Sequence, residues 1–164
     1  MATMSLADEI SNFVTNYRAT FLKGIPHLLN DDGAYLSFGC MFSGVEALAG
    51  YCYPDQKQNG LKFKAWLLDY FPVQYHALAS DLWDLRNSVI HGFSPKHFAL
   101  CHGQPQEHLT DKPPYVKVLD ATALFADFQV AVEQYLARLS SDTQLQSAFE
   151  KHLIAGKGGG LYVG

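Results

Sequence analysis

The stretch that decides the fold covers residues 77–92 and reads ALASDLWDLRNSVIHG. Its apolar residues recur at intervals of three and four, the spacing that brings side chains to one side of an α-helix. They form two adjoining stripes, the first made of Leu78, Leu82, Leu85 and Val89 and the second of Ala79, Trp83 and Ile90. The pattern predicts an α-helix with a broad apolar face.

Arg86 is out of place on that helix, because it projects between the two apolar stripes. A guanidinium in such a position must pair with an acid, extend to water or face a partner, since an isolated buried charge is very costly. Glu46 lies in another apolar stretch and is either its partner or an exposed acid. Asn87 and His91 are four residues apart and therefore neighbours on the helix surface. This grouping favours a functional site over the alternative of a structural ion pair and a histidine at a helix end.

The run Arg86-Asn87-Ser88-Val89-Ile90-His91 resembles the signature of the HEPN superfamily, in which a polar residue follows an arginine and a histidine comes after four to six intervening positions. The close resemblance covers residues 77–92, and the rest of the chain matches only in the order of its elements. The resemblance implies a small all-α bundle that is usually a homodimer. Many members are metal-independent endoribonucleases of toxin–antitoxin and defence systems, so the resemblance implies an RNA substrate and a cognate antitoxin protein as partners. Other members are not enzymes.

Metal-free RNA cleavage explains why these residue types occur together. An imidazole with a pKa near 6.5 can act as base on the ribose 2′-hydroxyl or as acid on the leaving 5′-oxygen. A guanidinium stabilises the charge that gathers on the phosphate. The resemblance assigns acid–base chemistry to His91, the phosphate clamp to Arg86 and an orienting role to Asn87. Each motif holds one histidine, so a two-fold dimer would supply both the acid and the base.

A catalytically inactive HEPN-like module that binds a nucleotide or a protein through the same cleft is the alternative function. The formal net charge of −4 supports this alternative, because the chain lacks the basic character of a general RNA binder. Neither function calls for a cofactor or a metal.

The chain length predicts a single domain, which we expect to be a HEPN-like helical domain over residues 1–155, and the glycines near the end predict a flexible tail over residues 156–164. Of the 164 residues, 48% are hydrophobic and 17% are charged. This composition is typical of a globular protein, although the share of charged residues is somewhat low. Three cysteines without framework spacing favour a reducing compartment. The start of the chain has no signal-peptide pattern and no apolar run is long enough for a membrane span, so we expect a cytoplasmic protein.

Periodicity and end signals predict a mainly all-α bundle of five to six helices. The expected helices cover residues 5–23, 34–51, 61–71, 74–91, 120–139 and 141–153. Residues 97–100 and 115–119 are expected to pair as a small β-hairpin inserted after the motif helix. A groove of small residues on the second helix is expected to receive a close helix neighbour; its members are Gly39, Ser43 and Ala47.

Three further patterns have a functional and an ordinary interpretation. Metal-type residues follow the motif at His97, Cys101, His102 and His108, but their spacing matches no standard zinc signature, and solvated loop histidines are the commoner case. Lys57, Lys62 and Lys64 form a basic strip that contacts phosphates or is merely a solvated helix face. The tail at residues 156–160 lacks the other features of a phosphate loop.

Overall fold

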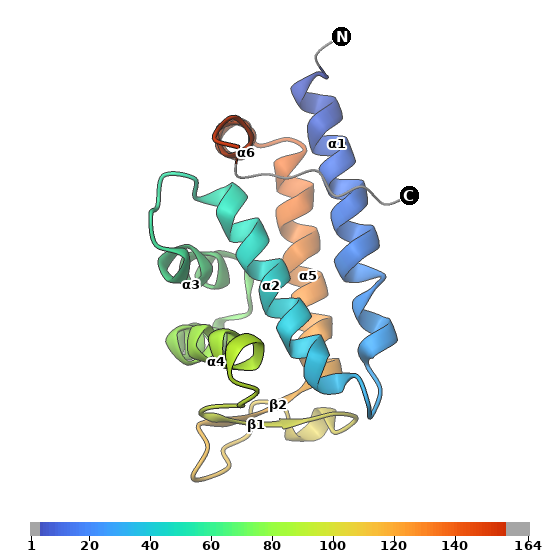
Figure 1. Cartoon of the computed structure of the whole chain (residues 1–164), viewed down its shortest axis with the longest axis vertical. Coiled ribbons are helices and arrows are strands. Elements are labelled where there is room, and N and C mark those ends of the chain that lie inside the picture. Colours follow the sequence, from blue (N-terminus) through green and yellow to red (C-terminus); the bar gives the residue numbers. More distant parts are fainter. Residues whose placement is uncertain (1–3, 157–164) are drawn as a thin grey trace.

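The computed structural model describes residues 4–156 and is mainly helical, with six α-helices and a two-stranded sheet in that part of the chain (Figure 1). The helices are α1 (Leu6–Tyr17), α2 (Ala34–Cys52), α3 (Asn59–Tyr70), α4 (Ala79–His91), α5 (Ala121–Leu139) and α6 (Thr143–Ile154). The strands are β1 (Phe98–Cys101) and β2 (Lys117–Asp120). The mainly all-α fold class predicted from the sequence is therefore confirmed. The predicted tail, apart from Gly156, lies outside the described residues.

Helix α2 is the centre of the bundle. It packs against α3, α4, α5 and α6, and Figure 1 shows it crossing in front of α5 while α3 and α4 lie on one side of it. A helix that is apolar on most of its sides is expected at such a central place. Within the described residues, no helix combines the length and apolarity needed to cross a bilayer.

The core is rich in aromatic side chains and holds α4 against the bundle. Trp66 of α3, Tyr75 and Tyr135 are fully buried, and so are Leu82 and Leu85 of α4. The first apolar stripe predicted for α4 is thus buried along its length. The second stripe is buried only at its start, since Ile90 remains 42% exposed. One side of the C-terminal turn of α4 is therefore open to solvent, at Ile90 and His91.

Side-chain caps begin three of the helices where the sequence places them. Ser5 accepts a hydrogen bond from the Asp8 backbone N–H, Asp120 from that of Ala123, and Asp142 from that of Gln144. Two predicted helices change form at one end. The segment Arg18–Leu22 is a π-helical turn after α1, and Val73–Leu78 is a 3₁₀ helix ahead of α4. A further 3₁₀ helix covers Ile25–Leu28, and another covers Pro105–Glu107.

The predicted β-hairpin is wrong in its topology, because β1 and β2 pair in parallel, with Phe98 opposite Lys117 and Cys101 opposite Asp120. Parallel neighbours need a connection of about a dozen residues or more, and residues 102–116 provide it. This connection folds back on the other edge of β2, where the Leu109 N–H donates to the Val118 carbonyl and the Val118 N–H to the Thr110 carbonyl. Hydrophobic alternation alone does not distinguish these pairings.

The predicted groove of small residues on α2 receives a helix neighbour at one of its three members, since a Cβ on Gly39 would lie 3.3 Å from Val89 of α4. Gly39 and Ser43 are half-exposed and Ala47 is exposed. A closer approach occurs at Gly44, where a Cβ would lie 2.7 Å from Tyr17 Oη and 3.1 Å from a ring carbon of Phe128. The core aromatic rings, which sequence spacing does not locate, decide which face of α2 is crowded.

Candidate functional site

Arg86 lies in the last turns of α4, and both terminal nitrogens of its guanidinium have a partner. Its Nη2 forms an ion pair with Glu46 Oε2, and its Nη1 donates to Asn87 Oδ1 at 3.0 Å. Its Nε is buried and has no hydrogen-bond partner among the described residues. The side chain is 17% exposed. The out-of-place arginine is therefore paired with an acid, the first of the ways in which such a charge can be accommodated.

Glu46 reaches Arg86 from the middle of α2. Its side chain is 21% exposed, so the two charges are partly withdrawn from water together. The contact ties the central helix of the bundle to the helix that carries the motif. Of the two roles that the sequence allowed for Glu46, the structure shows the arginine partner.

Trp83 supports the same guanidinium from the preceding turn of α4. Arg86 Cζ lies 5.4 Å from the centre of its ring, within the range of a cation–π contact. The indole in turn packs on Gly60 at the start of α3, where a Cβ would lie 2.8 Å from Trp83 Nε1. Sequence reasoning placed Trp83 in an apolar stripe and missed Gly60. The only available signal was a glycine in the first turn of a helix.

Asn87 and His91 do not form a pair in the structure, although both occupy the expected face of α4. The Asn87 side-chain oxygen accepts from Arg86, which assigns the amide to the guanidinium rather than to the imidazole. His91 is the last residue of α4 and its side chain is exposed. The site thus joins a fixed arginine–amide pair to a histidine that is open to solvent.

The candidate metal cluster is not assembled. Cys101 Sγ lies 3.8 Å from Asp120 Oδ2, His102 Nδ1 lies 3.4 Å from Asp31, and His97 is exposed. Within residues 4–156 no three histidine, cysteine or acidic side chains gather as they would around a metal ion. The residues of this cluster thus serve separate contacts.

His108 instead belongs to a hydrogen-bonded chain that anchors the β1–β2 connection to the bundle. Its Nδ1 accepts from the Asp120 backbone N–H at 3.0 Å, so the proton of the neutral ring is on Nε2. That nitrogen lies 2.6 Å from the hydroxyl of the buried Tyr75, which donates to Asp127 Oδ2 at 2.6 Å. This arrangement requires a neutral imidazole, because a second ring proton on Nδ1 would face the Asp120 N–H.

We expect the protein to lose stability in mild acid through His108. Burial lowers the pKa of His108 below its ordinary value, against the opposing effect of Asp127 and Asp120. The unfolded chain therefore binds a proton first as the pH falls, so the stabilisation is complete above about pH 6.5 and declines below it. Urea unfolding between pH 7.5 and 5 should show a shallower decline for His108→Gln than for wild type. His97→Gln, at an exposed position, is the matched control. Equal slopes for wild type and His108→Gln would contradict the expectation.

The predicted basic strip, which begins ahead of α3 and continues on that helix, is not a continuous exposed strip. Lys62, at its centre, is only 6% exposed, whereas Lys57 is exposed and Lys64 is half-buried. The long aliphatic stem of lysine allows such burial where the helix faces the core. The strip therefore offers no row of three neighbouring ammonium groups to a phosphate backbone.

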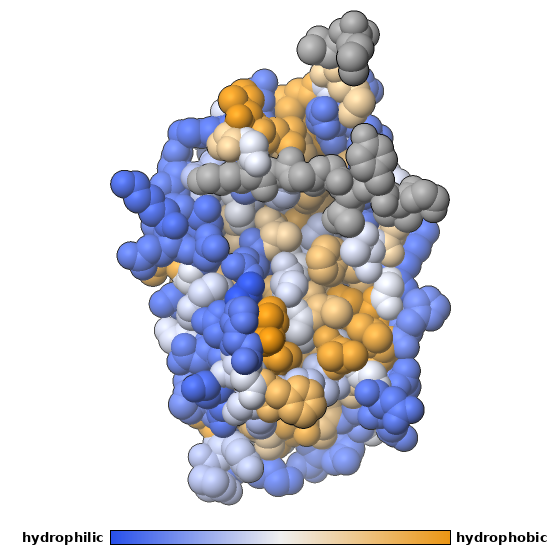
Figure 2. Space-filling model, in the orientation of Figure 1, coloured by the Kyte–Doolittle hydropathy of each residue, from blue (hydrophilic) through white to orange (hydrophobic). Residues whose placement is uncertain are grey.

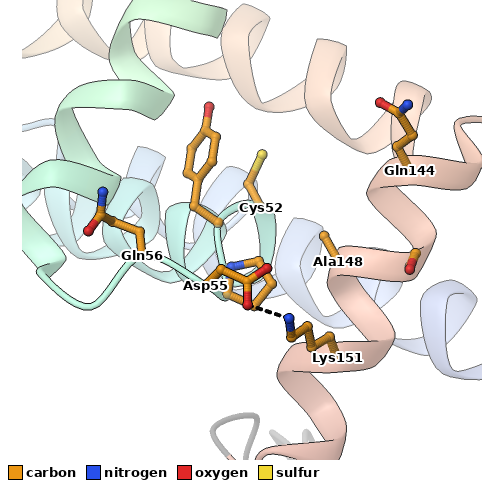
Figure 3. Close-up of a pocket in the computed structure, with 9 residues that line it drawn as sticks. Cys52, Asp55, Gln56, Gln144, Ala148 and Lys151 are labelled. Carbon is orange, nitrogen blue, oxygen red and sulfur yellow. Dashed lines mark ion pairs between the residues drawn. The ribbon is translucent and has the colours of Figure 1, made fainter.

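A surface pocket of about 440 Å³ lies elsewhere in the molecule, between the end of α2, the following loop and α6 (Figure 3). An ion pair between Lys151 and Asp55 closes one side of it. Burial raises the pKa of the Cys52 thiol to about 11, so this cysteine stays protonated and is a poor nucleophile. None of the three motif residues lines this pocket.

Fold and site together define a helical bundle in which the last turns of one helix carry an arginine–amide pair and an exposed histidine. A comparison with family models, curated proteins and solved structures finds no match to this chain. Any functional assignment has to come from the site itself and from the short motif that forms it.

Proposed function

We propose that this chain is a metal-independent endoribonuclease of the HEPN type that acts as a homodimer. The proposal rests on how the structure places Arg86 and His91, the two motif side chains with a direct role in the reaction. Arg86 is held in place from two sides, by Glu46 and Asn87, while His91 at the end of the same helix is open to solvent. A fixed guanidinium and an accessible imidazole are the two groups that metal-free phosphodiester cleavage needs.

In the proposed reaction one histidine removes the proton of a ribose 2′-hydroxyl. The 2′-oxygen attacks the adjacent phosphorus, and the bond from phosphorus to the 5′-oxygen breaks. A second histidine protonates that oxygen, which leaves a 2′,3′-cyclic phosphate and a 5′-hydroxyl. The guanidinium of Arg86 stabilises the negative charge on the phosphate oxygens during the transfer.

A second copy is required because of helix geometry. Arg86 and His91 are five residues apart, which separates their directions by about 140° around the helix axis. One chain therefore does not aim both groups at the same phosphate. Exposed apolar side chains suit an interface between copies, since Ile90 next to the histidine is 42% exposed and Leu36 on α2 is 58% exposed. Figure 2 shows apolar surface at mid-height and below on the face with α2 in front.

The direct test is cleavage of a pool of single-stranded RNAs by purified protein in the presence of a chelator. We expect products that end in a 2′,3′-cyclic phosphate, together with a dimer in light scattering at tens of micromolar. A monomer at that concentration would remove the two-histidine mechanism. Activity that the chelator abolishes would contradict metal independence.

An inactive binding module remains the second candidate, and one observation favours it. Glu46 already neutralises the charge of Arg86, so a phosphate would have to share the guanidinium with a carboxylate. In that case the purified protein cleaves no RNA, and replacing His91 changes no phenotype of cells that express it.

A further inference from the structure

One stretch of this acidic chain contains no acidic side chain. Residues 85–106 contain no aspartate or glutamate, yet they hold an arginine, a lysine and three histidines. The middle of this stretch is the loop of residues 92–97, which joins α4 to β1. Lys96 and His97 of this loop are exposed, as is His91 immediately before it. The loop therefore presents the ammonium group of Lys96 next to the candidate site, in a stretch that contains no acidic residue.

Phe93 stands in the same loop with an exposure unusual for a large aromatic residue. It is 78% exposed, and its ring meets Tyr35 with 4.5 Å between the ring centres at an interplanar angle of 50°. Its backbone has a φ of 47°, in the left-handed region that costs a bulky residue about 1 kcal/mol or more. A glycine would adopt this conformation without strain. The loop thus displays an aromatic ring to solvent at a cost in backbone strain.

We propose that Phe93 is a stacking platform for an unpaired base of single-stranded RNA, with Lys96 contacting a neighbouring phosphate. The inference deepens the proposed function and rests on it for the choice of RNA as ligand. Unpaired bases stack readily on exposed aromatic rings that lie beside cationic groups. A duplex would not offer its bases in this way.

Charge elsewhere in the molecule explains why stacking has to supply much of the affinity. Each of the three arginines is paired with an acid, Arg18 with Glu133, Arg86 with Glu46 and Arg138 with Asp142. The chain as a whole carries a formal net charge of −4. Long-range attraction of a polyanion is therefore weak. A stacked base adds binding free energy that does not depend on net charge.

The position of Phe93 fits a subsite next to the cleaved bond. It follows His91 by two residues, which keeps their Cα atoms within about 7 Å of each other. A phosphate beside His91 therefore places the adjacent nucleotide within reach of the Phe93 ring. The platform would hold that nucleotide while His91 acts on the phosphate.

Binding can be measured without cleavage by using a fluorescein-labelled 2′-O-methyl oligoribonucleotide, which lacks the 2′ nucleophile. Fluorescence anisotropy should show Phe93→Ala weakening the Kd by about 5- to 100-fold, the effect of one lost stacked base. Phe93→Trp should keep most of the affinity. Lys96→Ala should weaken binding and reduce the salt dependence by about one counterion. Ile154→Ala is the matched control, because Ile154 is an exposed apolar residue on α6, 80% accessible.

Phe93→Gly separates binding from structure. Glycine suits the backbone at this position, so thermal unfolding should stay within a few degrees of wild type while the affinity falls as it does for Phe93→Ala. If Phe93 served only the fold, its replacement would not lower the affinity while leaving the thermal stability unchanged.

Three results would overturn the subsite: an unchanged Kd for Phe93→Ala, no binding of the oligonucleotide by wild type, or loss of binding together with dissociation to monomers in light scattering. The last result would assign Phe93 to an interface between copies.

The nuclease proposal is judged separately, by cleavage of ordinary RNA. If wild type binds through Phe93 and cleaves nothing, the subsite stands and the nuclease fails. If wild type and Phe93→Ala cleave and bind equally, the nuclease stands and the subsite fails.

Discussion

Replacing His91 with alanine should lower the rate of RNA cleavage by about a hundredfold or more, because the substitution removes the group that transfers protons. The thermal stability should hardly change, since the side chain is exposed at the end of α4. Initial rates with chelator present, measured beside thermal unfolding of the same samples, test both parts. His97→Ala is the matched control, because His97 is also an exposed histidine, at the far end of the loop that follows His91.

The pH dependence of the wild-type rate adds a second check on the role of His91. If two copies of the residue act as base and acid, the rate should follow a bell-shaped profile whose two apparent pKa values belong to the pair. A rate that His91→Ala leaves unchanged, or that His97→Ala lowers equally, would contradict the assignment.

The ion pair between Arg86 and Glu46 should contribute to the stability of the fold, and Arg86 should contribute to the activity as well. Arg86→Met or Glu46→Leu alone should lower the free energy of unfolding by about 2–3 kcal/mol, because each leaves a partly buried charge without its partner. The double variant should recover most of that loss, since an apolar pair of similar size needs no solvation. Urea unfolding of the four proteins measures the coupling. A double variant as unstable as the sum of the single ones would contradict it.

Cleavage by the same variants distinguishes the two functions of the guanidinium. The double variant should be stable and inactive, because the phosphate clamp is absent. Arg86→Lys keeps the charge but loses the two-pronged hydrogen-bonding geometry, so the activity should recover only in part. Full activity in the double variant would exclude Arg86 from the reaction.

The elements that local sequence signals specify were predicted well. Helix starts at Ser5, Asp120 and Asp142 follow from side-chain caps, whose hydrogen bonds reach only two or three residues along the chain. The buried stripe of α4 follows in the same way from the spacing of Leu82 and Leu85. These features depend on neighbours in sequence and so can be inferred without a structure.

Features that join distant segments were predicted poorly or were left open. The strands β1 and β2 were expected as a hairpin, but the connection between them takes up the other edge of β2 and leaves a parallel pair. The crowded face of α2 lies at Gly44 because rings from α1 and α5 converge there. Both outcomes depend on which elements pack together, and the spacing of hydrophobic residues does not specify this.

The same distinction between local sequence and long-range packing applies to the candidate site. The sequence by itself determined that Arg86, Asn87 and His91 share the last turns of one helix, because helical periodicity alone decides it. Only the tertiary structure decided that Glu46 neutralises Arg86, that Asn87 turns to the guanidinium rather than to His91, and that Phe93 stands exposed against Tyr35. Glu46 and Arg86 are 40 residues apart in the chain, and the packing of α2 on α4 brings them together.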